Sequence, residues 1–425
     1  MPGGGSGKRW SRLRGRSISR PSWRKASDVP GCTTSDPPAG GGGPGENALV
    51  PLDARLRERI RREGPLRWDQ FMEAALYTPG IGYYEREPGH VGRAGDFYTA
   101  VSVGAVFGRL LAVALTALLD RLGRGSEPVW LIEAGAHDGR LAADVLGWVA
   151  EQRPDLMPGL RYGVVEPSLR RRGWQAARLA RWADRVEWFD SLAELAAVAP
   201  RGVLFANELL DALPVRRLGW DAARRCWREW HVALGEGADV ERFEWRLGGE
   251  PWQPRPEDQA LLAGAADPDG PLAAAFPDGL VWEHPEAALD WWRQAAGALR
   301  EGWLLTLDYG DWHGGGPRPH RPQGTLRAFR RQRQEPDLLA APGEQDLTAD
   351  VDFALIRRAG EAAGMVTEVA EPQGEWLTRL AGTPAGRREA EGWDARQRRQ
   401  FLTLVHPEHM GRRFQVLLQR RMGTG

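Results

Sequence analysis

From residue 129 onward, short apolar runs alternate with stretches of helical periodicity, and this alternation constrains the fold more than any other feature of the chain. The apolar runs predict strands at 129–132, 162–165, 186–189, 203–206 and 303–307. The periodic stretches predict helices at 141–151, 169–182, 192–198 and 285–299. Strands separated by helices form a parallel sheet covered on both faces. Right-handed crossovers then bring the carboxyl ends of the strands to one edge, where ligands bind. We therefore expect an α/β fold.

Three further segments differ in composition from this alternating region. Residues 1–49 are rich in Gly, Pro, Ser and Arg without apolar periodicity, which is typical of a disordered, basic tail. Between residues 215 and 255, large apolar side chains alternate with Arg and Glu, which predicts an antiparallel hairpin insertion. Residues 311–345 are rich in Gly, Pro and Arg, and we expect a long loop or lid there.

The charge balance excludes some classes of protein. The chain has 57 basic and 57 acidic residues, so nothing draws it as a whole to nucleic acid or to anionic membranes. Two cysteines, Cys32 and Cys226, are too few for a disulfide framework. Residues 97–119 contain one charge, Arg109, and could span a membrane, but this central charge and several polar residues favour a buried helix.

Residues 1–25 carry eight bases and no acid, which resembles a mitochondrial transit peptide. However, Lys and Asn each occur only twice in the chain, a bias typical of a GC-rich bacterial genome. We therefore expect a bacterial cytoplasmic protein, with the mitochondrial matrix as the alternative.

The strongest local pattern is LIEAGAHDG at residues 131–139, where a strand ends in Glu133 and turns through Gly135 and Gly139 into a helix. Glycines allow a backbone to approach a ligand, and a helix N-terminus offers free N–H groups. The Gly-x-Gly-x-x-Gly pattern of nicotinamide enzymes is absent from this loop. The acid before the turn would repel a pyrophosphate and suits a cationic amine. A plain tight turn is the alternative.

Acids also end the next two predicted strands. Glu166 could accept both hydroxyls of a ribose, or it could interact with the dipole of the following helix. Asp190 could contact an adenine amine, although capping of the next helix by Asp190 or Ser191 explains the pattern better.

The motif ANELLDALP at residues 206–214 follows the strand at 203–206. Asn207 and Glu208 stand where polar groups can hold a nucleophile, and one helical turn would place Asp211 on the same face as Glu208. We assign Asn207, Glu208 and Asp211 as catalytic candidates, with Asp308 and Tyr309 as the second choice for orienting an acceptor. Capping of a short helix is the alternative.

In this order, the four motifs are typical of an S-adenosylmethionine site. The methionine part would lie on the glycine loop, the ribose on Glu166, the adenine near Asp190 and the reacting end near Asn207. No metal site is expected, because His406 and His409 have no evident third ligand.

Several longer peptides resemble the MidA family of class I S-adenosylmethionine-dependent methyltransferases, which includes a mitochondrial complex I assembly methyltransferase. The similar segments include GDFYTA (95–100), ANELLDALPV (206–215), LDYGD (307–311), GEQDLTADVDFALI (343–356) and MGRRFQVLL (410–418). The resemblance covers roughly residues 64–420.

The resemblance implies a helical cap and cofactor-closing loop at 50–125, a Rossmann-like core at 126–310, and a lid with C-terminal core elements at 311–425. It implies that Gly95, Asp96, Phe97 and Thr99 lie beside the cofactor. It also implies a protein acceptor whose arginine is methylated, such as a respiratory-complex subunit.

Three positions depart from the family pattern. His137 stands at a usual glycine, Val101-Ser102 replace a Pro-Glu pair, and Arg109 replaces an acid. Side chains restrict the positive φ that glycine adopts freely. These departures leave a second hypothesis open, an assembly or binding protein of weak or absent activity.

Overall fold

A computed structural model describes residues 50–86, 99–123, 125, 127–235, 241–262 and 267–423. Within these ranges, no helix combines the length and the apolar character needed to cross a membrane. The apolar stretch around Arg109 instead forms α3 (Ala100–Val103) and the buried helix α4 (Ala105–Leu122), so the expected buried helix is confirmed where the structure describes it.

The largest sheet of the described residues has eight strands, and the five that the alternation predicts pair parallel with one another. These parallel strands are β2 (Val129–Ala134), β3 (Leu160–Val165), β4 (Val186–Phe189), β5 (Arg201–Asn207) and β10 (Glu301–Asp311). The order across the sheet is β15-β16-β10-β5-β2-β3-β4. The C-terminal strands β15 (Val366–Pro372) and β16 (Phe414–Arg421) extend it antiparallel, and β14 (Val351–Asp352) pairs with the end of β10.

Helices cover both faces of this sheet because successive strand side chains point to opposite sides. Leu131 belongs to an apolar cluster with one group of helices: α4, α5 (Arg140–Gln152), α11 (Gln373–Ala381) and α13 (Ala395–Val405). Its neighbours Trp130 and Ile132 belong to a cluster with another group: α7 (Leu192–Val198), α9 (Glu286–Ala298) and α10 (Phe353–Ala362). The expected class I α/β architecture is confirmed.

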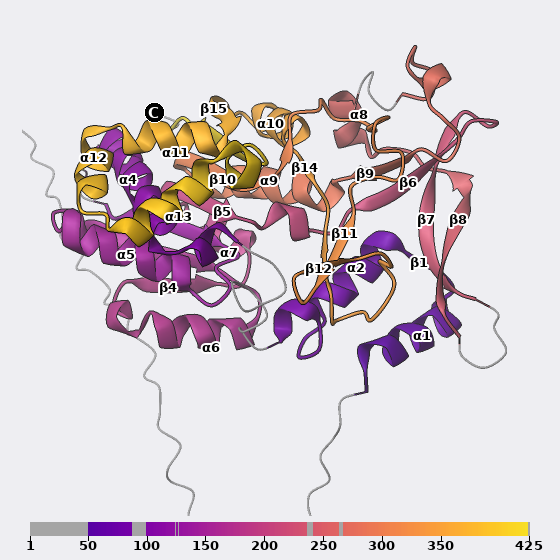
Figure 1. Ribbon diagram of the computed structural model, residues 1–425, viewed down its shortest axis with the longest axis horizontal. Helices are drawn as coiled ribbons and strands as arrows, with labels where there is room; N and C mark the ends of the chain where they lie inside the picture. Colours follow the sequence, from indigo (N-terminus) through magenta and orange to yellow (C-terminus); the bar gives the residue numbers. More distant parts are fainter. Residues whose placement is uncertain are drawn as a thin grey trace, which may run out of the picture. The chain divides into compact units, whose positions relative to one another are not determined.

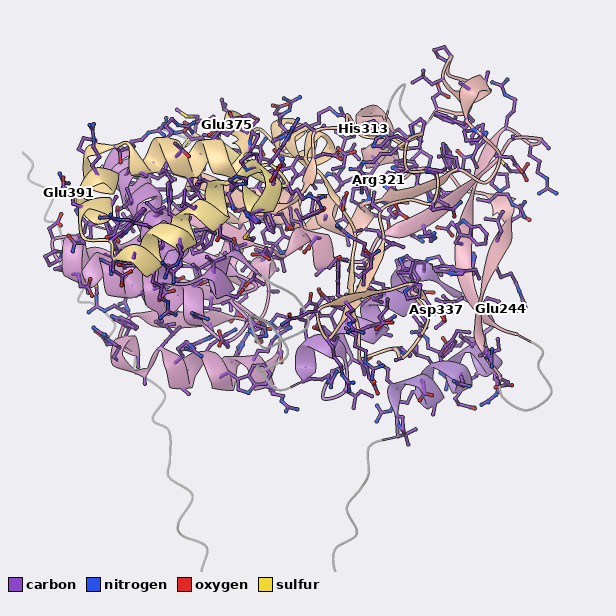
Figure 2. All side chains as sticks on the ribbon, viewed as in Figure 1. Glu244, His313, Arg321, Asp337, Glu375 and Glu391 are labelled. Atoms are coloured by element: carbon purple, nitrogen blue, oxygen red, sulfur yellow. The ribbon has the colours of Figure 1, made fainter. Side chains whose placement is uncertain are left out.

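The C-terminal helices contact the helix that precedes the first parallel strand. Figure 1 draws α11, α12 (Pro384–Glu391) and α13, in yellow, beside α4, and all three contact it. Their outer faces carry exposed acids such as Glu375 on α11 and Glu391 on α12 (Figure 2).

The predicted insertion is an antiparallel sheet that holds the N-terminal helices. Its strands are β1 (Leu66–Arg67), β6 (Arg216–Asp221), β7 (Cys226–Leu234), β8 (Phe243–Pro251) and β9 (Val281–His284). The helix α2 (Trp68–Tyr77) packs on it through Trp68 and Phe71, which contact Trp245 and Phe243. The helix α1 (Leu52–Glu63) contacts β7, and its Arg57 lies over the Phe243 ring.

The prediction of a long loop at 311–345 is wrong in part. This segment contains β11 (Arg327–Arg330) and β12 (Arg333–Glu335), which form a small sheet with β13 (Asp346–Thr348). Residues 331 and 332 turn with positive φ although neither is glycine, so the usual sequence signal of a hairpin is absent.

Two further helices complete the core. The predicted helix at 169–182 is α6 (Leu169–Arg178), followed by a separate 3-10 turn at Ala180–Trp182. A short helix, α8 (Pro256–Leu262), follows β8.

Candidate functional site

A cavity of about 1060 Å³ lies at the carboxyl ends of β2, β3 and β5. Its walls come from the glycine loop, the start of α6, the segment after β5, the start of α9 and the cap helices. In open parallel sheets, ligands bind in crevices at the carboxyl ends of the strands. The cavity therefore lies where this fold favours ligand binding.

The glycine loop forms the floor of this cavity and adopts three left-handed conformations. Gly135, His137 and Gly139 have φ values of 74°, 45° and 80°. A Cβ at Gly135 would lie 3.0 Å from Leu209 Cδ1, so this position requires glycine for both conformation and space. His137 adopts the conformation at a steric cost, and its carbonyl accepts a hydrogen bond from Gln175 Nε2 at 3.0 Å.

A buried carboxyl group ends β2. Glu133 is 3% exposed and accepts a hydrogen bond from the Tyr162 hydroxyl at 2.6 Å. Burial raises the pKa of Glu133 to about 7, and the Tyr162 hydrogen bond opposes this rise. A carboxyl group with such a pKa gains a charge readily when a cation binds beside it.

A second buried carboxyl group follows β3. Glu166 is 1% exposed, and its Oε1 accepts hydrogen bonds from the Ser168 N–H and from Arg171 Nε, both at 2.9 Å. Its Oε2 accepts a hydrogen bond from Gln175 Nε2 at 3.2 Å. The carboxylate is therefore held in one orientation at the wall of the cavity.

Asn207 and Glu208 form a third polar group, at the end of β5. Glu208 has φ 52°, and its N–H donates to the Leu307 carbonyl at 2.9 Å. Its Oε1 accepts hydrogen bonds from the Ala100 N–H at 2.8 Å and from Asn207 Nδ2 at 3.1 Å. Burial raises the pKa of Glu208 to about 8. Asn207 Oδ1 is buried and has no hydrogen-bond partner among the described residues.

The cavity brings together six of the residues singled out by sequence. These are Thr99, Glu133, Gly135, Glu166, Asn207 and Glu208. Gly139 stands at the start of α5, where it packs against Gln175 of α6, and it does not line the cavity. Gly95, Asp96 and Phe97 lie outside the described residues.

Asp190 and Asp211 are not among the residues that line the cavity. Asp190 is exposed and forms an ion pair with Arg172 on α6, while Ser191 caps α7 by accepting the Glu194 N–H. The expectation that Glu208 and Asp211 share one face of a helix is wrong. Glu208 is left-handed, and a single 3-10 turn begins only at Leu210.

Among the other cavity residues, Arg171 and Trp291 have no recognisable sequence signal, whereas Tyr77 belongs to a cluster of four tyrosines that either line a cleft or pack the cap. Arg171 lies on the wall beside Glu166, Trp291 comes from α9, and Tyr77 comes from α2. The Tyr77 hydroxyl donates to the Ala212 carbonyl at 2.9 Å. Their contribution depends on long-range packing, although the clustering of tyrosines near residue 80 is a weak hint.

Two of the departures from the family pattern have a local explanation. Arg109 does not line the cavity. It donates from Nε to Glu389 at 2.6 Å and from NH1 to Glu151 at 3.1 Å, so it joins α4 to α12 and α5. Ser102 forms a capping box with Thr99 at the start of α3. Neither substitution places an opposing charge in the cavity.

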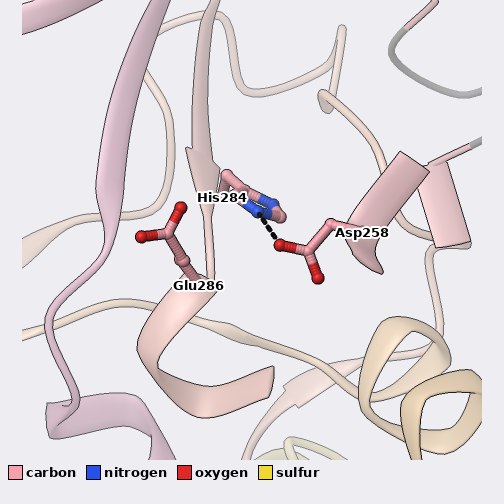
Figure 3. Close-up of side chains that lie close together, drawn as sticks. All are labelled: Asp258, His284 and Glu286. Atoms are coloured by element: carbon pink, nitrogen blue, oxygen red, sulfur yellow. Dashed lines mark ion pairs between the residues drawn. The ribbon is translucent and has the colours of Figure 1, made fainter. Parts of the chain in front are cut away.

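Asp258, His284 and Glu286 form a cluster whose ligand atoms lie within 4.8 Å of one another (Figure 3). Asp258 and His284 are fully buried. Although burial alone would raise the pKa of Asp258, the neighbouring His284 and the hydrogen bonds from Arg293 and Arg255 lower it. Arg216 also pairs with Glu286 at 3.0 Å. Because guanidinium groups already neutralise these carboxylates, we assign no metal site to the cluster.

Comparison with known proteins shows which family the chain belongs to and which cofactor it uses. Residues 110–370 match the family described as putative S-adenosyl-L-methionine-dependent methyltransferases. The chain belongs to this MidA-type methyltransferase family. The methyltransferase uses S-adenosylmethionine as its cofactor, and a nicotinamide oxidoreductase is set aside.

Relatives of this methyltransferase are known from sequence and from structure. Mitochondrial proteins named protein arginine methyltransferase NDUFAF7, or its homologue, are 29% identical in Drosophila melanogaster and 28% in Mus musculus. The alignments cover 78% and 87% of this chain, and 75% and 84% of the relatives. A likely methyl transferase from Burkholderia thailandensis, crystallised with S-adenosyl-homocysteine, is 30% identical in sequence to this chain. The two structures superpose with a TM-score of 0.70, and the match covers 88% of this chain and 92% of that one.

The residues of the cavity fit the methyltransferase cofactor. The left-handed backbone and the tight contact with Leu209 favour glycine at position 135, as expected where a backbone approaches a ligand closely. Asn207 keeps a buried carbonyl oxygen without a partner among the described residues, and the buried acids Glu133 and Glu166 can pair with an amine and with hydroxyl groups.

Proposed function

We propose that this methyltransferase transfers a methyl group to an arginine side chain of a protein. The observation that carries the proposal is the pair of acceptor atoms at the end of β5. Asn207 Oδ1 has no partner among the described residues, and both hydrogen bonds to Glu208 reach Oε1, which leaves Oε2 for an acceptor. Two adjacent oxygen acceptors match the planar donor groups of a guanidinium.

The charge of the cavity supports a cationic acceptor. Its described lining includes nine acids and four arginines. The acids are Asp69, Glu73, Glu85, Glu133, Asp138, Glu166, Glu208, Glu286 and Asp290; the arginines are Arg140, Arg170, Arg171 and Arg216. Several of these acids pair with arginines from outside the lining, as Asp138 does with Arg178 and Asp290 with Arg255. The support therefore comes from Glu133 and Glu208, which have no arginine partner among the described residues and can ionise beside a cationic side chain. The names of the mitochondrial relatives also support arginine as the acceptor.

In this proposal, the cofactor is held by Gly135 and Glu133 around its methionine part and by Glu166 at its ribose. Gly95, Asp96, Phe97 and Thr99 remain further candidates for contacts, whereas Gly139 and Asp190 do not line the cavity. When bound, S-adenosylmethionine supplies a methyl group already activated on a sulfonium. The protein therefore contributes mainly proximity, alignment and removal of a proton.

Glu208 is the proposed base. Its Oε2 and Asn207 Oδ1 accept hydrogen bonds from the guanidinium and point one nitrogen toward the methyl group. As the nitrogen–carbon bond forms and the sulfur–carbon bond breaks, a proton passes from that nitrogen to Glu208. A neighbouring cation favours the ionised carboxylate, so binding of the acceptor lowers the raised pKa of Glu208 toward the charged form. Asp211 does not line the cavity and is therefore a weaker catalytic candidate than Asn207 and Glu208.

The test is transfer of labelled methyl from S-adenosylmethionine into proteins of a bacterial lysate, followed by hydrolysis and amino-acid analysis. The proposal predicts label in methylated arginine and a rate for Glu208→Gln lower by roughly a hundredfold, the size of a general-base contribution. Glu375→Gln on α11 is the matched control and should retain the full rate. Label in lysine or in nucleic acid instead of arginine would refute the arginine proposal.

The second candidate function is an assembly or binding protein without turnover. The left-handed His137 in the glycine loop favours it, because a side chain there restricts how a ligand meets the backbone. Cofactor binding without transfer into any lysate protein would support this candidate. For either function we propose a bacterial cytoplasmic location, on the strength of the Lys and Asn scarcity, with a respiratory-complex subunit as the first acceptor to examine.

A further inference from the structure

Asp308 ends the part of β10 that lies beside β5, and its carboxylate is surrounded by backbone donors. The side chain is fully buried. Its Oδ2 accepts the N–H groups of Leu209, Leu210 and Asp211 at 3.1, 2.8 and 3.4 Å. Its Oδ1 accepts the N–H of Tyr309 at 2.7 Å. One carboxylate therefore satisfies three consecutive amides of the segment that follows Glu208.

These amides belong to the segment that gives Glu208 its unusual conformation. The register pairs Asn207 with Leu307, and the Glu208 N–H donates to the Leu307 carbonyl. The left-handed conformation of Glu208 is strained and persists only where neighbouring contacts impose it. The end of β10 supplies such contacts on both sides: Leu307 binds the Glu208 amide and Asp308 binds the next three.

Asp308 does not line the cavity, so it cannot orient an acceptor directly. We propose that Asp308 is a positioning residue for methyl transfer: it fixes the 209–211 backbone and thereby holds the Glu208 carboxylate beside Asn207 and the Ala100 amide. The inference rests on the proposed function of Glu208. It replaces the direct role in orienting an acceptor that the sequence suggests for Asp308.

A purely structural role is the competing explanation, and the chain offers a matched comparison. Asp352 is also a buried aspartate that accepts two backbone N–H groups, those of Ala354 and Leu355 at 3.1 Å each, where it caps α10. It is not among the residues that line the cavity. Asp308 accepts four backbone N–H groups and Asp352 accepts two, but only Asp308 binds the backbone that follows Glu208.

The test combines Asp308→Asn, Asp352→Asn and Glu208→Gln in the full chain. The asparagine at 308 keeps one carbonyl oxygen, so its NH₂ group must face either these three amides or the Tyr309 N–H, and the hydrogen bonds on that side are lost. We expect labelled transfer into lysate protein to fall at least tenfold in Asp308→Asn, while calorimetry shows the Kd for S-adenosyl-homocysteine changed by less than about threefold. Asp352→Asn keeps a carbonyl oxygen that can cap α10, and it should leave transfer unchanged.

The combination of variants separates positioning from stability. If Asp308 acts through Glu208, then adding Asp308→Asn to Glu208→Gln lowers transfer by less than about twofold further, because coupled residues are non-additive. Fully multiplicative losses would overturn the proposal. If Glu208→Gln alone retains full transfer, the proposed function of Glu208 fails and this inference fails with it; normal loss in Glu208→Gln with full activity in Asp308→Asn overturns only the inference.

Amide exchange in the unaltered protein tests the inference even if Asp308→Asn does not fold. The amides of Leu209 and Leu210 should exchange at least about a hundredfold more slowly than in an unstructured peptide, as expected for bonded amides that open only with sub-global unfolding. Unprotected amides at both positions would overturn the proposal.

Discussion

The backbone N–H of Ala100 donates a 2.8 Å hydrogen bond to Oε1 of Glu208. Ala100 begins α3, just after Thr99, whereas Glu208 follows β5 in the central sheet. This bond joins the two sides of the cavity at the residue proposed as the base. It also fixes which oxygen of Glu208 stays free, because Asn207 Nδ2 donates to the same Oε1.

The raised pKa of Glu208 predicts a dependence of stability on pH. Its pKa is about 8 in the folded protein against an ordinary value of 4.5, so the native state binds the proton more tightly than the unfolded state. Glu208 therefore lowers stability as pH rises from about 4.5 to 8. Glu208→Gln should be more stable than the native protein by about 1–3 kcal/mol at pH 8.5 and nearly equal to it at pH 5. Urea unfolding at the two pH values measures this difference, and an equal difference at both would contradict the account.

The left-handed conformation of His137 predicts a difference between two substitutions. With φ at 45°, His137→Gly relieves a steric cost that His137→Ala retains. The glycine variant should be more stable than the alanine variant by about 1 kcal/mol, and it should bind S-adenosyl-homocysteine at least as tightly as the native protein. Thermal unfolding and calorimetry provide the measurements. An alanine variant as stable as the glycine variant would show that the loop is not strained.

At Gly135, adding a side chain should weaken cofactor binding and lower stability, whereas removing the side chain of His137 should not. An added Cβ would lie 3.0 Å from Leu209 Cδ1 in a backbone with φ 74°, so Gly135→Ala should weaken cofactor binding at least tenfold and destabilise the fold by about 1–3 kcal/mol. Gly147→Ala in α5 is the control, since nothing lies within 4 Å of its Cβ and alanine favours helix. Unchanged binding in Gly135→Ala would mean that the loop does not approach the cofactor.

Glu389 predicts a loss of stability without a loss of cofactor binding. This carboxylate is 8% exposed, pairs with Arg109, and accepts hydrogen bonds from Trp148 and Trp393 at 2.9 and 3.1 Å. Glu389→Gln leaves Arg109 without its buried partner and should cost about 2–4 kcal/mol in urea unfolding. Glu391→Gln, exposed on the same helix (Figure 2), should change stability by less than about 0.5 kcal/mol. Weakened cofactor binding in Glu389→Gln would indicate that Arg109 acts on the site after all.

Much of the central sheet could be predicted from sequence because the signal is local. Apolar runs separated by helical periodicity identify β2, β3, β4, β5 and β10, and the acids Glu133 and Glu166 mark two strand ends that meet at one edge. Because Asn207 and Glu208 come at the end of another parallel strand, the sequence also predicts that they lie at that edge.

The remaining features depend on contacts between distant segments. Glu208 is left-handed because β10 lies beside β5, and no residue near Glu208 signals that pairing. The small sheet of β11, β12 and β13 turns without glycine, and Asp308 serves amides about a hundred positions earlier in the chain. Helical spacing between Glu208 and Asp211 was a reasonable local prediction that the long-range contacts overrode.

The most direct test of the account is a crystal structure of the protein with S-adenosyl-homocysteine. We predict that the homocysteine part lies against Gly135 and Glu133 and that the ribose contacts Glu166. The sulfur should face Asn207 and Glu208, with space for an acceptor nitrogen to come within about 3–3.5 Å of the methyl carbon. A ligand whose sulfur faces away from Asn207 and Glu208, or one bound outside this cavity, would contradict the proposed site and the role of Glu208 as the base.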